Sequence, residues 1–315
     1  MIQANNQELP VPGGVLIARG ATGWVYKINN RIALKIPRKG SHEEFACEVK
    51  FYNILESHSP PCPDISRSFL RVPKGNFMAF CSGGSLDQRL QEHQTRGGKS
   101  QQFKILGINK CEPLHLVEQW AAELSSAVAW LESLGYCHTD IRPANLLFDE
   151  QDHIKLTDFD CWEEVGSPAL GSAPPWARVL GPEAGSDCGS FGYNGARVEQ
   201  FAIGSVLYMM TRGHEPYEDG TCAPEESSNV VDLLQQMRFP SLGEGVLDNI
   251  IDRCWNGGYP LLKDLADETK LLSRAHNIPR AVALTEEYCK EIQEECQQLI
   301  ESGLLEGIKE GSLLI

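Results

Sequence analysis

The residues in this chain best suited to chemistry are two aspartates and an asparagine that occur close together. Asp140 and Asn145 stand five residues apart, and Asp158 follows thirteen residues after Asn145. A loop with this spacing can direct a carboxylate and an amide into one cleft, and the apolar run before Asp158 predicts a strand that delivers it beside them. Phosphoryl transfer needs a carboxylate to accept the proton of the attacking hydroxyl, and oxygen ligands to hold Mg²⁺. The three residues supply this set, although each could also be a simple turn former or strand end.

The sequence around these residues resembles a known family. It reads His138-Thr139-Asp140-Ile141-Arg142-Pro143-Ala144-Asn145 and later Asp158-Phe159-Asp160, which resembles the catalytic loop and metal-binding motif of the eukaryotic protein-kinase superfamily. The resemblance implies that Asp140 is the catalytic base and that Arg142 steadies the γ-phosphate of ATP. It also implies that Asn145 and Asp158 are the Mg²⁺ ligands.

A second resemblance lies upstream, in the run from Ala18 to Val25. It is similar to the kinase glycine-rich loop with alanine at the first glycine, while Gly20 and Gly23 keep open access for phosphate to the backbone amides. Such a glycine pair can equally form a plain hairpin turn. The family likeness implies that Ala18, Gly20, Gly23 and Val25 contact the nucleotide.

Ten residues after Val25, Lys35 resembles the strand lysine that binds the α and β phosphates. Strand alternation places its apolar neighbours on the opposite face. We expect its partner to be Glu48 on the following helix, with Glu43 and Glu44 as competitors. The resemblance assigns the adenine site to residues that could also be plain core: Val25, Ala33, Met78, Ala79, Cys81 and Leu147.

Several departures from the family pattern bear on activity. Thr139 replaces the arginine that usually precedes the catalytic aspartate, which implies a non-RD kinase with no cation there to pair with a phosphorylated activation loop. Glu199 replaces an aspartate, and its longer side chain can still accept hydrogen bonds from the catalytic-loop backbone. Asp160 replaces a glycine; it either stiffens the turn and adds a carboxylate near the metals, or marks the loss of catalysis.

Because the polar catalytic set is complete, we expect an ATP- and Mg²⁺-dependent protein kinase, with Ser or Thr favoured over Tyr as acceptor. Two alternatives stay open: a pseudokinase scaffold that binds a partner, or a small-molecule hydroxyl kinase of the aminoglycoside or choline kinase type. Gly181-Pro182-Glu183 resembles the protein-kinase large lobe and favours the protein kinase. The chain looks similar to the compact kinase-like proteins of filamentous fungi, on the runs 23–26 and 254–257.

Two groups of elements must position these residues. Short apolar runs before residue 82 predict antiparallel strands with a hairpin turn at Asn29-Asn30, and residues 43–56 have helical spacing. We therefore expect an α+β, two-lobed protein-kinase-like fold, with a small antiparallel β-sheet N-lobe containing one helix and a large, mainly helical C-lobe. The expected organisation is an N-terminal tail at 1–13, the N-lobe at 14–82, the C-lobe at 83–265, and a C-terminal helical extension at 266–315 that covers the large lobe.

Composition limits the partners. A formal net charge of −15 gives a field that repels nucleic acids and anionic membranes. The 11 cysteines include no C-x-x-C pair, which favours reduced thiols, and no apolar run is long enough to span a membrane. We expect a monomer with a cytoplasmic location, the nucleus being also open, and a protein substrate as its partner.

Overall fold

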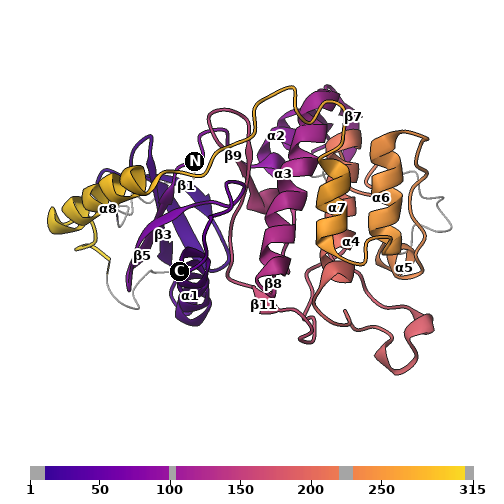
Figure 1. The fold of residues 1–315 in the computed structure, drawn as a ribbon, viewed down its shortest axis with the longest axis horizontal. Helices are drawn as coiled ribbons and strands as arrows, with labels where there is room; N and C mark the ends of the chain where they lie inside the picture. The colour runs from indigo at the N-terminus through magenta and orange to yellow at the C-terminus, as the bar shows by residue number, and fades with distance from the viewer. Residues whose placement is uncertain (1–10, 99–103, 220–229, 309–315) are drawn as a thin grey trace. The chain divides into compact units, whose positions relative to one another are not determined.

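The first part of the chain forms a five-stranded antiparallel sheet of order β1-β2-β3-β5-β4 (Figure 1). The structure is a computed structural model that describes residues 11–98, 104–219 and 230–308. The side chain of Asn29 accepts hydrogen bonds from the amides of Arg31 and Ile32, at 2.8 and 2.9 Å, which confirms the predicted hairpin turn. The strands are β1 (Val15–Arg19), β2 (Gly23–Lys27), β3 (Ile32–Pro37), β4 (Ser68–Val72) and β5 (Gly75–Ala79).

Between β3 and β4 the chain forms helix α1 (His42–Glu56), as its sequence spacing predicted. It buries Phe45, Glu48, Tyr52 and Leu55 at steps of three or four residues, which align on one side of a helix. Glu48 is therefore carried on the inward-facing stripe although it is charged. This requires a buried counter-ion.

A distant helix, α8 (Glu286–Glu301), covers one face of this sheet and packs against β4 (Figure 1). Its Ile292 and Cys296 are 0% exposed and join one core cluster. The expectation that the C-terminal extension covers the large lobe is wrong for α8. The sheet face presents apolar side chains that need cover, and α8 supplies a matching apolar stripe. The cluster on the sheet side consists of Val11, Tyr26, Ile32, Leu34, Ile36, Phe69 and Phe77.

The chain forms two compact units. The first unit comprises residues 11–82, 158–160 and 282–308, and the second comprises 83–157 and 161–281, within the described ranges. The sequence-derived extension at 266–315 is thus divided between the units, and residues 158–160 group with the sheet. Most of the N-terminal tail expected at 1–13 lies outside the described residues, but Val11 is buried in the cluster under α8.

The second unit is mainly helical, and its helices α3, α4, α6 and α7 lie side by side (Figure 1). Helix α4 (Ala196–Arg212) is buried almost all round, because its sequence is apolar on nearly every side. The predicted fold class, an antiparallel sheet with one helix followed by a mainly helical part, is confirmed. Among the described residues, no helix combines the length and hydrophobicity needed to span a lipid bilayer.

The elements of the second unit are, in chain order, α2 (Leu86–Glu92), β6 (Gln94–Arg96), β7 (Ile105–Ile108), α3 (Leu114–Ser133), β8 (Tyr136–Cys137), η2 (Pro143–Asn145), β9 (Leu146–Phe148), β10 (Ile154–Leu156), β11 (Glu163–Glu164), η3 (Pro182–Asp187), α4 (Ala196–Arg212), α5 (Val230–Gln235), α6 (Val246–Asn256) and α7 (Leu262–Thr269).

Candidate active site

A buried ion-pair cluster joins β3, α1 and the segment 158–160 in the first unit. The Nζ atom of Lys35 lies 2.7 Å from Oε2 of Glu48 and 2.5 Å from Oδ1 of Asp158. Lys35 is 6% exposed and Glu48 0%, whereas the side chain of Asp158 is 30% exposed. Glu43 and Glu44, the competing sequence candidates, are both exposed on α1. The structure therefore brings together three of the predicted site residues, and Glu48 is the partner of the lysine.

Burial and charge act against each other in this cluster. Burial lowers the pKa of Lys35, but the carboxylates of Glu48 and Asp158 outweigh burial, so this pKa lies above its ordinary value. Burial raises the pKa of Glu48; Lys35 opposes this effect, and the charges of Asp158 and Asp160 add to it. One ammonium thus faces an excess of carboxylate groups. A bound divalent cation would offset this excess.

Asp158 is held in a strained backbone conformation, with φ of +68°. A non-glycine residue in this region costs about 1–3 kcal/mol and persists only where its surroundings fix it. The fixing residue is Phe159, which is 0% exposed and packs on α1, with ring centroids 5.2 Å from Phe51 and 5.5 Å from Tyr52. This packing holds the carboxylate of Asp158 against Lys35.

Four predicted nucleotide residues share the sheet face that carries Lys35: Ala18 of β1, Val25 of β2, Ala33 of β3 and Met78 of β5. Strand pairing places Val25 opposite Lys35 and opposite Ala18, and Ala33 opposite Met78. Directly opposed residues of antiparallel strands point to one face, as do alternate residues of a strand. These five side chains therefore lie on the face opposite to the one that α8 covers.

The other predicted nucleotide residues lie outside this face. Ala79 ends β5 and Cys81 follows it in the first unit, while Leu147 lies in β9 of the second unit. Gly23 has a steric role that sequence reasoning missed. A Cβ atom there would lie 2.8 Å from the carbonyl oxygen of Ile36 and 3.0 Å from Cε of Lys35, because the lysine side chain runs directly across the glycine.

In the second unit, the carboxylate of Asp140 accepts hydrogen bonds from three side chains. The donors are Nε of Arg142 at 2.9 Å, Nδ2 of Asn145 at 2.8 Å, and Oγ of Ser172 at 2.9 Å. Asn145 also donates to the main-chain oxygen of Asp140, and its own Oδ1 has no partner among the described residues. This orientation leaves an amide oxygen free to bind a cation. Ser172 was missed, because its only sequence signal is a hydroxyl in a proline-rich segment.

The backbone of the same loop is held by Glu199 and His138. Glu199 is 2% exposed, and its two carboxylate oxygens accept hydrogen bonds from the amides of His138 and Thr139, at 3.0 and 2.9 Å. The longer side chain thus still accepts hydrogen bonds from the catalytic-loop backbone. Nε2 of His138 lies 2.9 Å from the carbonyl oxygen of Thr157, the residue before Asp158 in the chain. The hydroxyl of Thr139 donates a hydrogen bond to the carbonyl of Cys161. The residue before Asp140 is therefore uncharged and bonded to the backbone.

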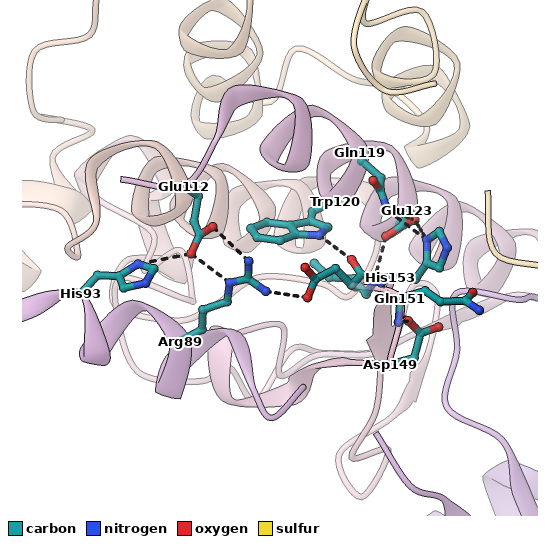
Figure 2. Close-up of polar contacts among 11 residues, drawn as sticks. Arg89, His93, Glu112, Gln119, Trp120, Glu123, Asp149, Gln151 and His153 are labelled. Atoms are coloured by element: carbon teal, nitrogen blue, oxygen red, sulfur yellow. Dashed lines mark hydrogen bonds and ion pairs between the residues drawn. The ribbon is translucent and has the colours of Figure 1, made fainter. Parts of the chain in front are cut away.

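A polar network fixes the β9–β10 hairpin, which lies between Asn145 and Asp158 in the sequence (Figure 2). Arg89 of α2 pairs with Glu112 at 2.9 Å and with Asp152 of the hairpin turn at 2.7 Å. Glu123 of α3 lies 2.6 Å from Nδ1 of His153, and both side chains are buried. The hydrogen bond to Glu123 raises the pKa of His153. These contacts anchor the hairpin to α2 and α3.

Comparison with known proteins agrees with this geometry. The family model for the protein kinase domain matches residues 16–306. The human Citron Rho-interacting kinase is 30% identical over 240 residues, which cover 71% of this chain and 10% of that protein. The rat Citron rho-interacting kinase is 27% identical over 236 residues, with the same coverage of 71% and 10%. The cAMP-dependent protein kinase catalytic subunit of Arthrobotrys oligospora is 30% identical over 166 residues, or 52% of this chain and 27% of that protein. The chain spans only a small part of these relatives, but it belongs to the protein kinase family.

Proposed function

We propose that this chain is an ATP- and Mg²⁺-dependent protein kinase that transfers the γ-phosphate of ATP to a protein hydroxyl. The observation that carries the proposal is the buried cluster in which Lys35 contacts both Glu48 and Asp158. A lysine placed in this way can bind nucleotide phosphates while its charge stays fixed by the glutamate. Protein kinases generally use ATP and Mg²⁺, and the donor chemistry of this chain suits both.

The proposed roles rest on the resemblance to the kinase motifs, and the side-chain contacts within each unit support them. Asp140 orients the acceptor hydroxyl and accepts its proton, with Ser172 and Asn145 holding its carboxylate in one orientation. Arg142 offers its remaining guanidinium donors to the transferred phosphate. Asn145 and Asp158 are the residues that would hold Mg²⁺, which, when bound, neutralises charge on the phosphate oxygens.

We propose further that activity does not depend on phosphorylation of the activation segment. Thr139 replaces the usual arginine, and its hydroxyl already donates to the carbonyl of Cys161. No cation stands at this residue to pair with a phosphoserine. For the acceptor we propose Ser or Thr, which a peptide panel that also includes Tyr acceptors would test.

The proposal is tested by incubating the purified chain with labelled ATP, Mg²⁺ and generic protein acceptors. Wild type should transfer phosphate and Asp140→Asn should not, whereas the exposed control Asp232→Asn on α5 should behave as wild type. Equal transfer by wild type and Asp140→Asn would remove Asp140 from its role.

Nucleotide binding is tested separately by thermal unfolding. A ligand that binds only the folded state stabilises it by about 2.7 kcal/mol at a free concentration of about 100 times Kd. Stabilisation by ATP with Mg²⁺ in the wild type is therefore expected. Its absence, together with absent transfer, would instead favour a scaffold that binds a protein partner.

A further inference from the structure

Two residues of the first unit that are 138 positions apart in the sequence form a hydrogen bond. The hydroxyl of Thr22 donates to Oδ2 of Asp160 at 2.8 Å. Thr22 lies in the loop between β1 and β2 that resembles the kinase glycine-rich loop, and Asp160 stands where glycine is usual in the resembling motif. The unusual aspartate therefore has a specific partner in the loop.

Arg38, directly after β3, holds the same loop through its carbonyl groups. Its Nη1 atom lies 3.3 Å from the carbonyl oxygen of Gly20 and 3.1 Å from that of Ala21, and its amide donates to the carbonyl of Thr22 at 2.9 Å. A carbonyl and the next amide of a trans peptide point in opposite directions. The amides of Ala21 and Thr22 therefore point away from Arg38, and neither donates a hydrogen bond to another described residue. Both amides can therefore donate to an anion such as a phosphate group.

Asp160 completes this arrangement because it is fixed by its neighbours in the chain. Phe159 is buried against α1, and Asp158 contacts Lys35 at 2.5 Å. A hydrogen bond from Thr22 to Asp160 thus ties the loop to the segment that also presents Asp158. The backbone conformation of the loop is thereby set before any ligand binds.

We propose that Thr22 and Asp160 form a latch that holds the glycine-rich loop ready to receive the nucleotide phosphates, with Asp160 acting as a positioning residue. The inference rests on the proposed function, because it names what Asp160 does for ATP binding. Holding the loop in advance removes part of the ordering entropy that phosphate binding would otherwise cost. Asp160 therefore contributes to ATP binding through the loop, and its presence does not mark the loss of catalysis.

The latch itself is measured in the nucleotide-free protein by hydrogen exchange of the amides of Gly20 and Arg38, which donate to the carbonyl oxygens of Gly23 and Thr22 at 2.8 and 2.9 Å. Thr22→Val and Asp160→Gly each remove the hydrogen bond and should raise exchange by about 3- to 30-fold, the effect of losing a partly exposed hydrogen bond to a charged group. The double variant should exchange no faster than either single variant, since both remove one interaction. Thr22→Ser, which keeps the hydroxyl, should exchange at close to the wild-type rate.

The consequence for the ligand is measured by calorimetric titration. Thr22→Val and Asp160→Gly should each weaken Mg²⁺-ATP binding by about 3- to 30-fold and leave the binding of adenosine, which has no phosphates, unchanged. If Asp160 were instead a metal ligand, Asp160→Gly would weaken Mg²⁺-ATP binding while Thr22→Val would not, and the latch would be rejected. Tighter ATP binding by the two variants would show that the bond blocks the site, and would also overturn the proposal.

Failure of the proposed function is distinguishable from failure of the latch. A wild-type chain that binds no ATP would refute the proposed function, and with it the role of the latch in nucleotide binding. The exchange data would still show whether the hydrogen bond holds the loop. A wild-type chain that binds ATP, with exchange of the Gly20 and Arg38 amides unaltered in both variants, would refute the latch alone.

Discussion

Replacing Lys35 by methionine should separate the stabilising and the ligand-binding roles of the buried cluster. Lys35 and Glu48 are 6% and 0% exposed and lie 2.7 Å apart. Removing one partner of such a pair leaves a buried charge without a counter-ion, which costs about 3–5 kcal/mol. The lost contact with Asp158, whose side chain is 30% exposed, adds at most about 1 kcal/mol because solvent screens it.

A second substitution isolates the cause. Glu48→Leu in the Lys35→Met background removes the stranded carboxylate, and an apolar pair of similar volume is often as stable as the ion pair it replaces. The double variant should therefore recover most of the 3–5 kcal/mol, to within about 1 kcal/mol of wild type. It should still bind ATP no better than Lys35→Met, because the phosphate-binding ammonium is absent from both.

The pH dependence has a defined sign. Burial raises the pKa of Glu48 even in the presence of Lys35, and the pKa of this carboxyl should rise further without the lysine. A carboxyl whose pKa is higher in the folded than in the unfolded state destabilises the fold above its folded pKa, and this deficit shrinks as the pH falls toward the unfolded pKa. The stability gap between wild type and Lys35→Met should therefore be largest at pH 8 and smaller at pH 5. The gap for the double variant should change little with pH.

Native-state hydrogen exchange is the suitable assay, because it reports opening free energies for separate parts of a chain that has two compact units. Amides of β2 and β3 should lose protection in Lys35→Met, while those of α4 serve as the internal control. Protection of β2 and β3 within about 1 kcal/mol of wild type at pH 8 would show that Glu48 is not stranded as a charge. A double variant no more stable than Lys35→Met would likewise refute the reasoning.

Three further predictions concern α8 and the catalytic loop. Ile292→Ala should lower the opening free energy of β2 and β3 by about 2–5 kcal/mol in the same exchange assay, because Ile292 is 0% exposed. The control Leu284→Ala, at a residue that is 41% exposed, should change this free energy by less than about 0.5 kcal/mol. Ser172→Ala should lower kcat for phosphate transfer and leave the KM for ATP unchanged, since its hydroxyl donates to the carboxylate of the proposed base. An unchanged kcat would exclude this positioning role. Glu199→Leu should cost about 1–3 kcal/mol in thermal unfolding, because it leaves two backbone amides without acceptors, and Glu199→Gln, which keeps one acceptor, should cost less.

The local structure of the first unit could be predicted from the sequence because it depends on short-range patterns. Short apolar runs predicted β2 and β3, and strand alternation placed the apolar neighbours of Lys35 on the face opposite to its side chain. Helical spacing put Glu48 on the inward stripe of α1. Each of these inferences needs only residues within a few positions of one another.

The missed features depend on contacts between residues far apart in the sequence. The bond from Thr22 to Asp160 spans 138 residues, and the hydroxyl of Ser172 is 32 residues from its acceptor on Asp140. No periodicity encodes such pairs, since a hydroxyl in a loop can have any partner. The position of α8 was missed for the same reason: its apolar stripe showed that it must pack, and nothing in the stripe identified the sheet as its partner.

The cover that α8 gives to the sheet has a consequence for how the protein is made. The strands lie before residue 82, whereas α8 belongs to the segment that begins at residue 282. At a synthesis rate of about 5–20 residues per second, roughly 10–40 s separate the emergence of these two parts from the ribosome. During that interval the apolar side chains that α8 will cover remain exposed on the nascent chain. Newly made strands therefore need either chaperone protection or delayed folding until translation has passed α8.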